Sequence, residues 1–531
     1  MSLSRKKELS MKTNAILGRV HSWGVNNKLR FAPHKTSAML VTNKLKYDTP
    51  VLSMAGSSIE MVRKIKLLGL TIDDKMTFNE HTKNVCIKAA EIYKRLSRAA
   101  KVDWGLNEEI IRTIYTAAVE PVITYAAAAW APATAKLGIR KKLNSIQRGF
   151  AQKLCKSYRT VSLNSALVLS GILPLDLRIQ EAAALYEARK GSSRHIPGDR
   201  EIEAAARFAE TPHPALQMTL EFECLEDQEQ VDSRNVQTVR IFTDGSKIEG
   251  KVGAALSIWD NDGETRNLKL SLAAYCTVYQ AELLAICRAT DLILKRPEGS
   301  FGLYSDSMSA LMTLANPGSL HPLAVSARKN LAQASHQGKA IALFWVKAHA
   351  GLPGNERADE LAKEAALSSR RKPDYDRCPI SFIRSQIRMG SLDEWNRRYV
   401  SGETASVTKM FLPDAIAAFR IVKQVRPVGI VTQVLTGHGG FSSYLNRFKC
   451  KGNPSCICDP DKDEDIPHLL LDCPVYAAVR QDLEFELDVR LTNTTIAELI
   501  GSKKYRERFL RYCVEVAKHA INRNRTATMV A

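Results

Sequence analysis

The stretch that most constrains the fold lies between residues 237 and 369, where short apolar segments alternate with turns and longer amphipathic segments. Three strands in succession are predicted first, over Thr238–Thr243, Val252–Trp259 and Thr265–Ser271. A helix over Val278–Leu294 follows, then strands over Gly302–Ser305 and Ile341–Val346, each leading into a helix. This order predicts an α/β unit in which a mixed five-stranded sheet is flanked by helices.

Four carboxylates occupy special places in that pattern. Asp244 and Asp306 directly follow predicted strands, where ligand sites form in open α/β sheets. Glu282 lies in the first turns of a predicted helix, and Asp359 at the opening of the last one, where the helix dipole favours an anion. Singly, each acid is an ordinary turn or surface residue. Together in a cleft they would repel one another unless hard divalent cations joined them, which predicts two Mg²⁺ or Mn²⁺ ions and phosphodiester cleavage.

The chain of 531 residues is too long for one core, and its net charge is +20, from 76 Lys and Arg against 56 Asp and Glu. Such an excess favours nucleic acid as a partner, with solubility as the alternative explanation. Predicted helices at residues 85–99, 107–119 and 138–156 precede the sheet, and the first and third carry basic faces.

The N-terminus is basic but lacks the apolar stretch of a signal peptide, and no segment approaches the length of a membrane span. We therefore expect an intracellular protein, in the nucleus or the cytoplasm, with no membrane partner and reduced thiols. The oligomeric state stays open. Composition predicts five regions: a mainly helical one at 1–190, a linker at 191–236, the α/β unit at 237–369, a connector at 370–425 and a C-terminal segment at 426–531.

Four sequence blocks in the α/β unit resemble, in order, those of type 1 ribonuclease H. They are Phe242-Thr243-Asp244-Gly245-Ser246, Gln280-Ala281-Glu282-Leu283, Tyr304-Ser305-Asp306-Ser307, and the run from Trp345 to Asp359. The resemblance implies metal ligation by Asp244, Glu282, Asp306 and Asp359, and cleavage of RNA paired to DNA, which the 2′-hydroxyl distinguishes from DNA. It also implies that His349 aids proton transfer or product release and that Asn355 supports the last helix. Ala350 departs from the Ser or Thr common in the family.

The first 185 residues or so resemble the end of a non-LTR retrotransposon reverse transcriptase, on Phe31–Thr36, Leu67–Asp73 and Pro121–Trp130. The paired polymerase aspartates should precede Trp23, and no such pair is found there; Asp73-Asp74 comes too late. We therefore expect a truncated retrotransposon polyprotein, comprising a palm-edge and thumb remnant, without polymerase activity.

Near the C-terminus, Cys456, Cys458, His468 and Cys473 form a group whose ligand types suit tetrahedral structural zinc. The segment resembles the zinc segment closing such retrotransposon proteins, but a single residue separates its first two cysteines where the family usually has two. Cys450 therefore remains an alternative to Cys456, and nucleic-acid binding is the expected purpose.

Two other functions stay open. One is a non-catalytic nucleic-acid-binding remnant of a reverse transcriptase. The other is a transposase-like nuclease, whose acids usually run Asp, Asp, Glu; here Glu282 precedes Asp306.

Overall fold

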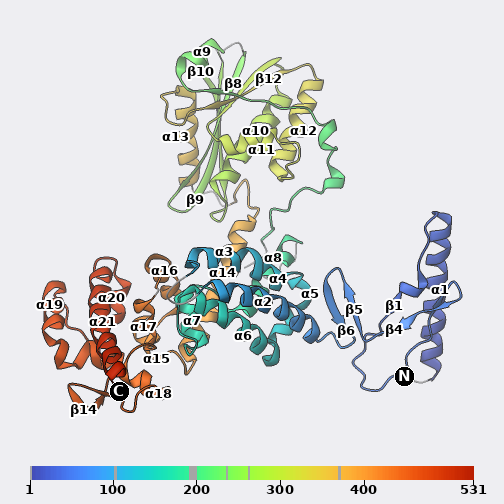
Figure 1. The fold of residues 1–531 in the computed structure, drawn as a ribbon. Coiled ribbons are helices and arrows are strands. Elements are labelled where there is room, and N and C mark those ends of the chain that lie inside the picture. Colours follow the sequence, from blue (N-terminus) through green and yellow to red (C-terminus); the bar gives the residue numbers. More distant parts are fainter. Residues whose placement is uncertain are drawn as a thin grey trace. The chain divides into compact units, whose positions relative to one another are not determined.

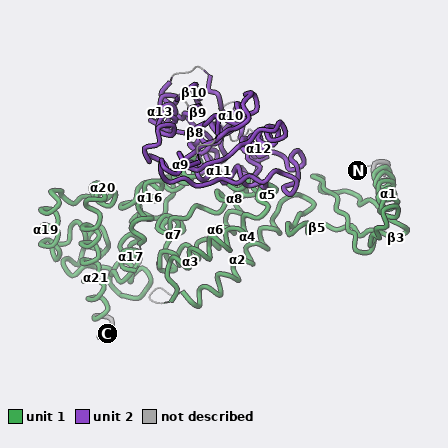
Figure 2. The backbone as a smooth tube through the Cα atoms, turned by 90° about the horizontal axis from the view of Figure 1, so that it is seen from above, with its two compact units in different colours: residues 1–183, 389–531 green, residues 184–388 purple. Residues whose placement is uncertain are grey.

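The computed structural model describes residues 3–100, 105–190, 200–234, 237–260, 263–368, 372–427 and 429–530. The chain divides into two compact units (Figure 2). Unit 1 comprises residues 1–183 and 389–531, and unit 2 comprises residues 184–388. Within the described ranges, no helix combines the length and the apolar character needed to cross a membrane.

Unit 2 is built on a mixed sheet of six strands, in the order β10-β9-β8-β11-β12-β7. The first three strands pair antiparallel, and β8, β11, β12 and β7 pair in parallel. The strands are β7 (Glu223–Leu225), β8 (Val239–Ile248), β9 (Lys251–Asp260), β10 (Gly263–Leu272), β11 (Ser300–Ser305) and β12 (Ala340–Val346). The α/β class and all five predicted strands are confirmed, but the predicted strand number was one short. The additional strand, β7, pairs with the edge of β12.

Helices cover both faces of this sheet (Figure 1). One face is covered by α13, which packs on β8, β9 and β10, and the other by α10, with α11 and α12 beside it. The α-helices that lie wholly within unit 2 are α9 (Gln228–Ser233), α10 (Val278–Lys295), α11 (Met308–Ala315), α12 (Pro322–His336) and α13 (Pro353–Leu367). The main hydrophobic core of unit 2 lies between the sheet and α10. Helix α12 was not predicted from the sequence.

Segments flanking the predicted ribonuclease H region also take part in unit 2. Residues 223–233, inside the predicted linker, form β7 and α9, and Val231 of α9 is buried against Leu352 and Phe242. Further out, Ile202 pairs with Cys378 and Leu272 pairs with Tyr375 in isolated parallel bridges. The ordered unit therefore extends beyond residues 237–369.

Unit 1 is mainly helical. Its first part begins with α1 (Leu3–Asn26) and short strands: β1 (Ser37–Ala38), β2 (Ser53–Met54), β3 (Ser57–Ser58), β4 (Glu60–Met61), β5 (Lys64–Leu67) and β6 (Leu70–Asp73). Helices follow: α2 (Asn79–Ala99), α3 (Glu108–Ile114), α4 (Glu120–Thr124), α5 (Ala127–Trp130), α6 (Leu137–Leu154) and α7 (Leu163–Ser170). The next helix, α8 (Leu175–Arg189), starts in this part and ends in unit 2. Its second part begins within α14 (Ile380–Ser401), which starts in unit 2. It also holds α15 (Ser406–Phe411), α16 (Ala415–Val425), α17 (Ile430–Thr436), α18 (Ser442–Arg447), β13 (Ser455–Cys456), β14 (Asp459–Asp463), α19 (Ala477–Leu487), α20 (Thr495–Gly501) and α21 (Arg506–Val530). Helices α2, α3 and α6 match predicted ones.

The two parts of unit 1 share one hydrophobic core, which includes Leu70 and Leu167 from the first part and Cys473 and Phe509 from the second. Buried polar contacts join them as well. Thr408 Oγ1 donates to Ser165 Oγ at 2.8 Å, and Thr432 Oγ1 donates to the carbonyl of Cys155 at 2.7 Å. Unit 2 is therefore inserted, in sequence, between two halves of one folded unit.

Candidate functional site

Asp244 and Asp306 come together because β8 and β11 are neighbours. Their parallel pairing ends at Thr243 opposite Ser305, so Asp244 is the next residue of β8 and Asp306 directly follows β11. Neighbouring strands lie about 4.8 Å apart, which brings the two carboxylates within reach of one ion. The prediction that β8 ends at Asp244 was wrong, because this strand continues to Ile248 through its hairpin with β9, where Asp244 pairs with Ala255.

Glu282 reaches the same place from α10. A capping box at Thr277 and Gln280 starts this helix and puts Glu282 in its second turn. Gly245 lets the helix approach β8, since a Cβ there would lie 2.7 Å from the backbone nitrogen of Glu282. The glycine thus serves close packing of helix on strand next to the two acids.

Asp359 lies near this group but outside it. It is the seventh residue of α13, so its predicted place at the helix opening was wrong; the helix begins earlier, at Pro353. Its Oδ2 accepts a hydrogen bond from Lys363 Nζ at 2.6 Å, one turn further along. The structure therefore brings three of the four predicted acids together and leaves the fourth beside them, paired with a lysine.

Ligand oxygens of Asp244, Glu282 and Asp306 all lie within 4.8 Å of one another. Asp244 and Glu282 are only 6% and 7% exposed, and within the described part of the chain Asp244 Oδ2 and Glu282 Oε2 have no hydrogen-bond partner. Buried carboxylate oxygens are rarely left unsatisfied. Two such oxygens facing a third acid fit a divalent cation, so the residues present suit the predicted metal.

The electrostatics of the three acids agree with that fit. Burial, followed by the charges of Asp306 and Asp359, raises the pKa of Asp244 to about 7. Burial and the same kind of repulsion raise the pKa of Glu282 well above its usual range. Burial also raises the pKa of Asp306, against a hydrogen bond from Asn355. Without a cation, the cluster resists carrying its full negative charge.

Residues of the fourth sequence block surround Asp306. Asn355 Nδ2 donates to Asp306 Oδ2 at 3.4 Å, and Trp345 Nε1 donates to its carbonyl oxygen at 2.9 Å. Trp345 was not predicted to be a site residue. Its position at the start of the fourth sequence block was the one signal that could have indicated this. His349 is exposed in the turn between β12 and α13 and has a φ of 55°. The charge of His349 acts to lower the pKa of Asp306, against the larger effect of burial.

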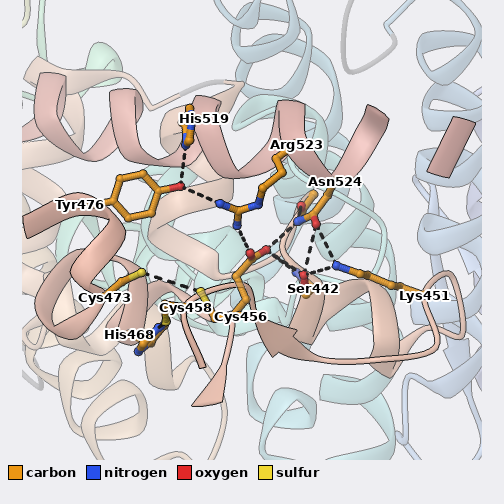
Figure 3. A network of polar contacts seen from close by, with 12 residues as sticks. Ser442, Lys451, Cys456, Cys458, His468, Cys473, Tyr476, His519, Arg523 and Asn524 are labelled. Atoms are coloured by element: carbon orange, nitrogen blue, oxygen red, sulfur yellow. Dashed lines mark hydrogen bonds and ion pairs between the residues drawn. The ribbon is translucent and has the colours of Figure 1, made fainter. Parts of the chain in front are cut away.

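The second predicted group lies in unit 1 (Figure 3). One ligand atom from each of Cys456, Cys458, His468 and Cys473 lies within 4.8 Å of the others. The Sγ atoms of Cys456 and Cys473 are 3.8 Å apart, and Cys458 Sγ is 3.1 Å from His468 Nε2. A tetrahedral site with Zn–S bonds of about 2.3 Å has S–S edges of about 3.8 Å. The ligand types and spacing therefore fit zinc. Cys450 is exposed and lies outside the group.

A buried acid ties the same segment to the C-terminal helix. Glu464, which follows β14, is fully buried and accepts hydrogen bonds from Ser442 Oγ at 2.9 Å and Asn524 Nδ2 at 2.6 Å, and it pairs with Arg523 of α21. Lys451 donates to Ser442 Oγ and to Asn524 Oδ1, which closes the network (Figure 3). The sequence offered no signal for this buried charge.

Comparison with known proteins finds a family match over the α/β unit. Residues 236–367 match the family model described as RNase H. A 115 kDa protein of the type-1 retrotransposable element R1DM of Drosophila melanogaster is 28% identical over 34% of this chain and 18% of its own length. A Pol polyprotein of the type-1 element R1 2 of Nasonia vitripennis is 26% identical over 38% of this chain and 51% of its own length. The chain thus spans about half or less of these relatives.

A solved RNase H domain from Mycobacterium tuberculosis, fused to maltose-binding protein, is 20% identical and covers 24% of this chain and 94% of that chain. Its TM-score is 0.21. Residues 236–367 are a ribonuclease H domain, in a chain related to the Pol polyproteins of R1-type non-LTR retrotransposons.

Proposed function

We propose that this chain hydrolyses the RNA strand of RNA–DNA hybrids at a centre where Asp244, Glu282, Asp306 and Asp359 hold two Mg²⁺ or Mn²⁺ ions. The observation that carries this proposal is the group formed by the buried Asp244 and Glu282 with the half-buried Asp306, in which Asp244 and Glu282 each have a carboxylate oxygen without a partner in the described structure. When bound, such ions supply a hydroxide near neutral pH and stabilise the charge on the attacking and leaving oxygens.

The chain's own residues have separable roles in this proposal. Asp244, Glu282 and Asp306 form the fixed part of the site, held by two strands and a helix. Asp359 completes the set once its carboxylate leaves Lys363, with which it is now paired. Asn355 orients the Asp306 carboxylate through its hydrogen bond. We assign to His349, which is exposed in the turn before α13, the transfer of a proton as product leaves.

Asp306→Asn tests the proposal, because it removes a ligand charge with little change of volume. Changing residues that merely orient a metal ligand typically costs ~10–100-fold in metal affinity or activity. We therefore expect Mg²⁺-dependent cleavage of a labelled RNA–DNA hybrid to fall by more than about a hundredfold. Asp232→Asn, on the exposed surface of α9, removes the same charge and should cleave like the wild type. Cleavage by Asp306→Asn within tenfold of wild type refutes the assignment. Hybrid binding without cleavage by the wild type instead favours a non-catalytic remnant.

We also propose that Cys456, Cys458, His468 and Cys473 bind one structural Zn²⁺. The support is the 3.8 Å spacing of two thiol sulfurs and the imidazole nitrogen facing a third. Burial and the neighbouring thiol of Cys456 raise the pKa of Cys473, an effect that a bound cation reverses. Elemental analysis of the purified protein should find one zinc per chain, and a zinc-free, fully folded protein would exclude this site.

A further inference from the structure

Two segments that lie outside the matched ribonuclease H domain bind to each other and to the domain. Cys378 N donates to the carbonyl of Glu201 at 2.8 Å, and Glu203 N donates to the carbonyl of Cys378 at 2.9 Å. We call residues 201–203 together with residues 374–378 the flanking clasp. Both segments belong to unit 2, so their contacts with the domain lie within one folded unit.

The flanking clasp contacts the chain that leads from β10 into α10. Backbone hydrogen bonds of 2.7 and 2.9 Å join Ser271 and Ala273 to the clasp. A further contact lies on the helix itself, where Gln280 Nε2 donates to the carbonyl of Arg377 at 3.2 Å. Since α10 begins only two residues before Gln280, the clasp reaches the first turn of the helix that carries Glu282.

Gln280 makes two kinds of contact at this helix start. Its side-chain oxygen accepts a hydrogen bond from the backbone nitrogen of Thr277 at 3.0 Å, which completes the capping box. Its amide nitrogen is the group that contacts the clasp. Gln280 is only 1% exposed, so water cannot readily replace a partner that this amide loses.

Glu203 of the clasp also accepts a hydrogen bond from this amide, and its side chain is only 10% exposed. Burial by itself would raise the pKa of Glu203, but hydrogen bonds from His321, Gln280 and Tyr375 lower it below its ordinary value. His321 Nε2 lies 3.2 Å from Glu203 Oε2, and the hydroxyl of Tyr375 donates to Oε1. A buried carboxylate with three partners is fixed in place, because moving it would leave its charge unpaired.

We propose that the flanking clasp is a positioning element for Glu282, in which the carboxylate of Glu203 holds Gln280 and so fixes the first turn of α10. Glu282 follows two residues after Gln280, where the helix packs so closely on β8 that a Cβ on Gly245 would lie 2.7 Å from the backbone nitrogen of Glu282. A small shift of the helix start therefore moves the Glu282 carboxylate relative to the two aspartates. The proposal rests on the proposed hydrolysis, which gives Glu282 its part in holding metal, and it adds residues outside the matched domain.

Full-length variants distinguish this contact from general stability. Gln280→Glu keeps an oxygen to cap α10 but replaces the amide with a second carboxylate against Glu203. The double variant Glu203→Gln/Gln280→Glu exchanges the two groups, so that an amide again meets a carboxylate. Gln333→Glu makes the same change at an exposed position of α12 and is the matched control.

Two quantities are measured for each variant. Binding of Mn²⁺ in Mg²⁺-free buffer is followed by electron paramagnetic resonance, and Asp306→Asn identifies the Mn²⁺ that belongs to the acid group. The kcat and KM for hybrid cleavage are determined separately, because a misplaced metal ligand lowers kcat whereas a damaged binding surface raises KM. Circular dichroism melting checks that the variants fold.

We expect Gln280→Glu to lower both kcat and Mn²⁺ affinity by about tenfold or more, the scale typical of losing a group that orients a metal ligand, and to leave KM within about twofold. The double variant should recover most of both losses, because the effects of residues in contact are not additive. Gln333→Glu should match the wild type. The proposal is overturned if Gln280→Glu behaves like the wild type, or if the exchange recovers neither quantity.

Two further outcomes are also decisive. If Gln280→Glu does not fold, Tyr375→Phe, which removes one hydroxyl from Glu203, is measured in its place; unchanged Mn²⁺ binding by that variant overturns the proposal. A wild type that binds Mn²⁺ at the acid group without cutting the hybrid refutes the hydrolysis, while the Mn²⁺ affinities still decide the role of the clasp. A wild type that binds no Mn²⁺ there refutes both.

Discussion

Asp244 has an electrostatic cost that depends on pH. Its pKa is raised from an ordinary aspartate value to about 7 by burial and by the neighbouring acids. The unfolded chain therefore loses this proton at a lower pH than the folded protein does. Below the unfolded pKa, both states are protonated and the effect vanishes. As pH rises towards 7, the unfolded state gains an advantage, which reaches at most about 4 kcal/mol at about 1.4 kcal/mol per pKa unit.

Asp244→Asn should consequently stabilise the metal-free protein. In EDTA at pH 7.5 we expect the transition of unit 2 to move to a higher temperature than in the wild type, and the difference to disappear near pH 4. Added Mg²⁺ should stabilise the wild type but not the variant, because binding to the folded state raises stability only where the ligands remain. Differential scanning calorimetry at the two pH values measures both effects. A variant that is less stable than wild type in EDTA at pH 7.5 would contradict the carboxylate repulsion.

At the scale of elements, the distance between β8 and α10 decides whether Glu282 meets the two aspartates. A Cβ on residue 245 would lie 2.7 Å from the nitrogen of Glu282 and 2.9 Å from the Cβ of Ala281. Backbone cannot yield as a flexible side chain can, so Gly245→Ala should push the helix away. Overpacking of this kind typically costs about 1–3 kcal/mol.

We expect Gly245→Ala to lower both the melting temperature of unit 2 and the rate of hybrid cleavage, the rate by at least tenfold. Gly299→Ala is the matched control, since a Cβ there meets nothing within 4 Å. Thermal melting and hybrid cleavage of the two variants are compared with the wild type. Equal cleavage by the two variants would show that the β8–α10 distance does not govern the site.

The elements that sequence patterns predicted are those with strong periodicity. Strands β8 to β12 and helices α10 and α13 carry short apolar runs or apolar residues at strand or helix spacing, so their existence followed from local pattern. By contrast, β7 is three residues long and stands in a polar, acidic stretch. Its place comes from pairing with the open edge of β12, a tertiary effect that local pattern does not contain.

In the candidate site, too, some features followed from the sequence and others depended on tertiary structure. Motif order identified the acids, and strand order explains why Asp244 and Asp306 meet. The position of Asp359 in mid-helix depends on where α13 begins, and helix ends are poorly determined by sequence. The pairing of Asp359 with Lys363 follows from their spacing of four residues, yet the nearness of this pair to Asp244 is visible only in three dimensions.

At the scale of the whole molecule, unit 1 is folded from both ends of the chain. Cys456 and Cys473 belong to the same hydrophobic core as Leu167 and Phe150 of the N-terminal helices. Glu464 connects the cysteine segment to α21 through Arg523 and Asn524. The segment that we propose to bind zinc is therefore part of the core that supports α2 and α6, rather than a separate appendage.

Zinc loss should therefore destabilise all of unit 1. Structural zinc in small domains contributes about 10 kcal/mol or more of apparent binding energy, and part of this should stabilise the shared core. We expect Cys473→Ser to release the metal and to lower the unfolding temperature of α2 and α6 together with that of α21, while the strands of unit 2 stay protected. Hydrogen exchange of the full chain, read by mass spectrometry, follows each segment. Cys450→Ser, at an exposed thiol outside the group, should change neither zinc content nor exchange. If Cys473→Ser loosens only residues 450–476 and leaves α2 and α6 as protected as in the wild type, the shared core does not depend on the metal.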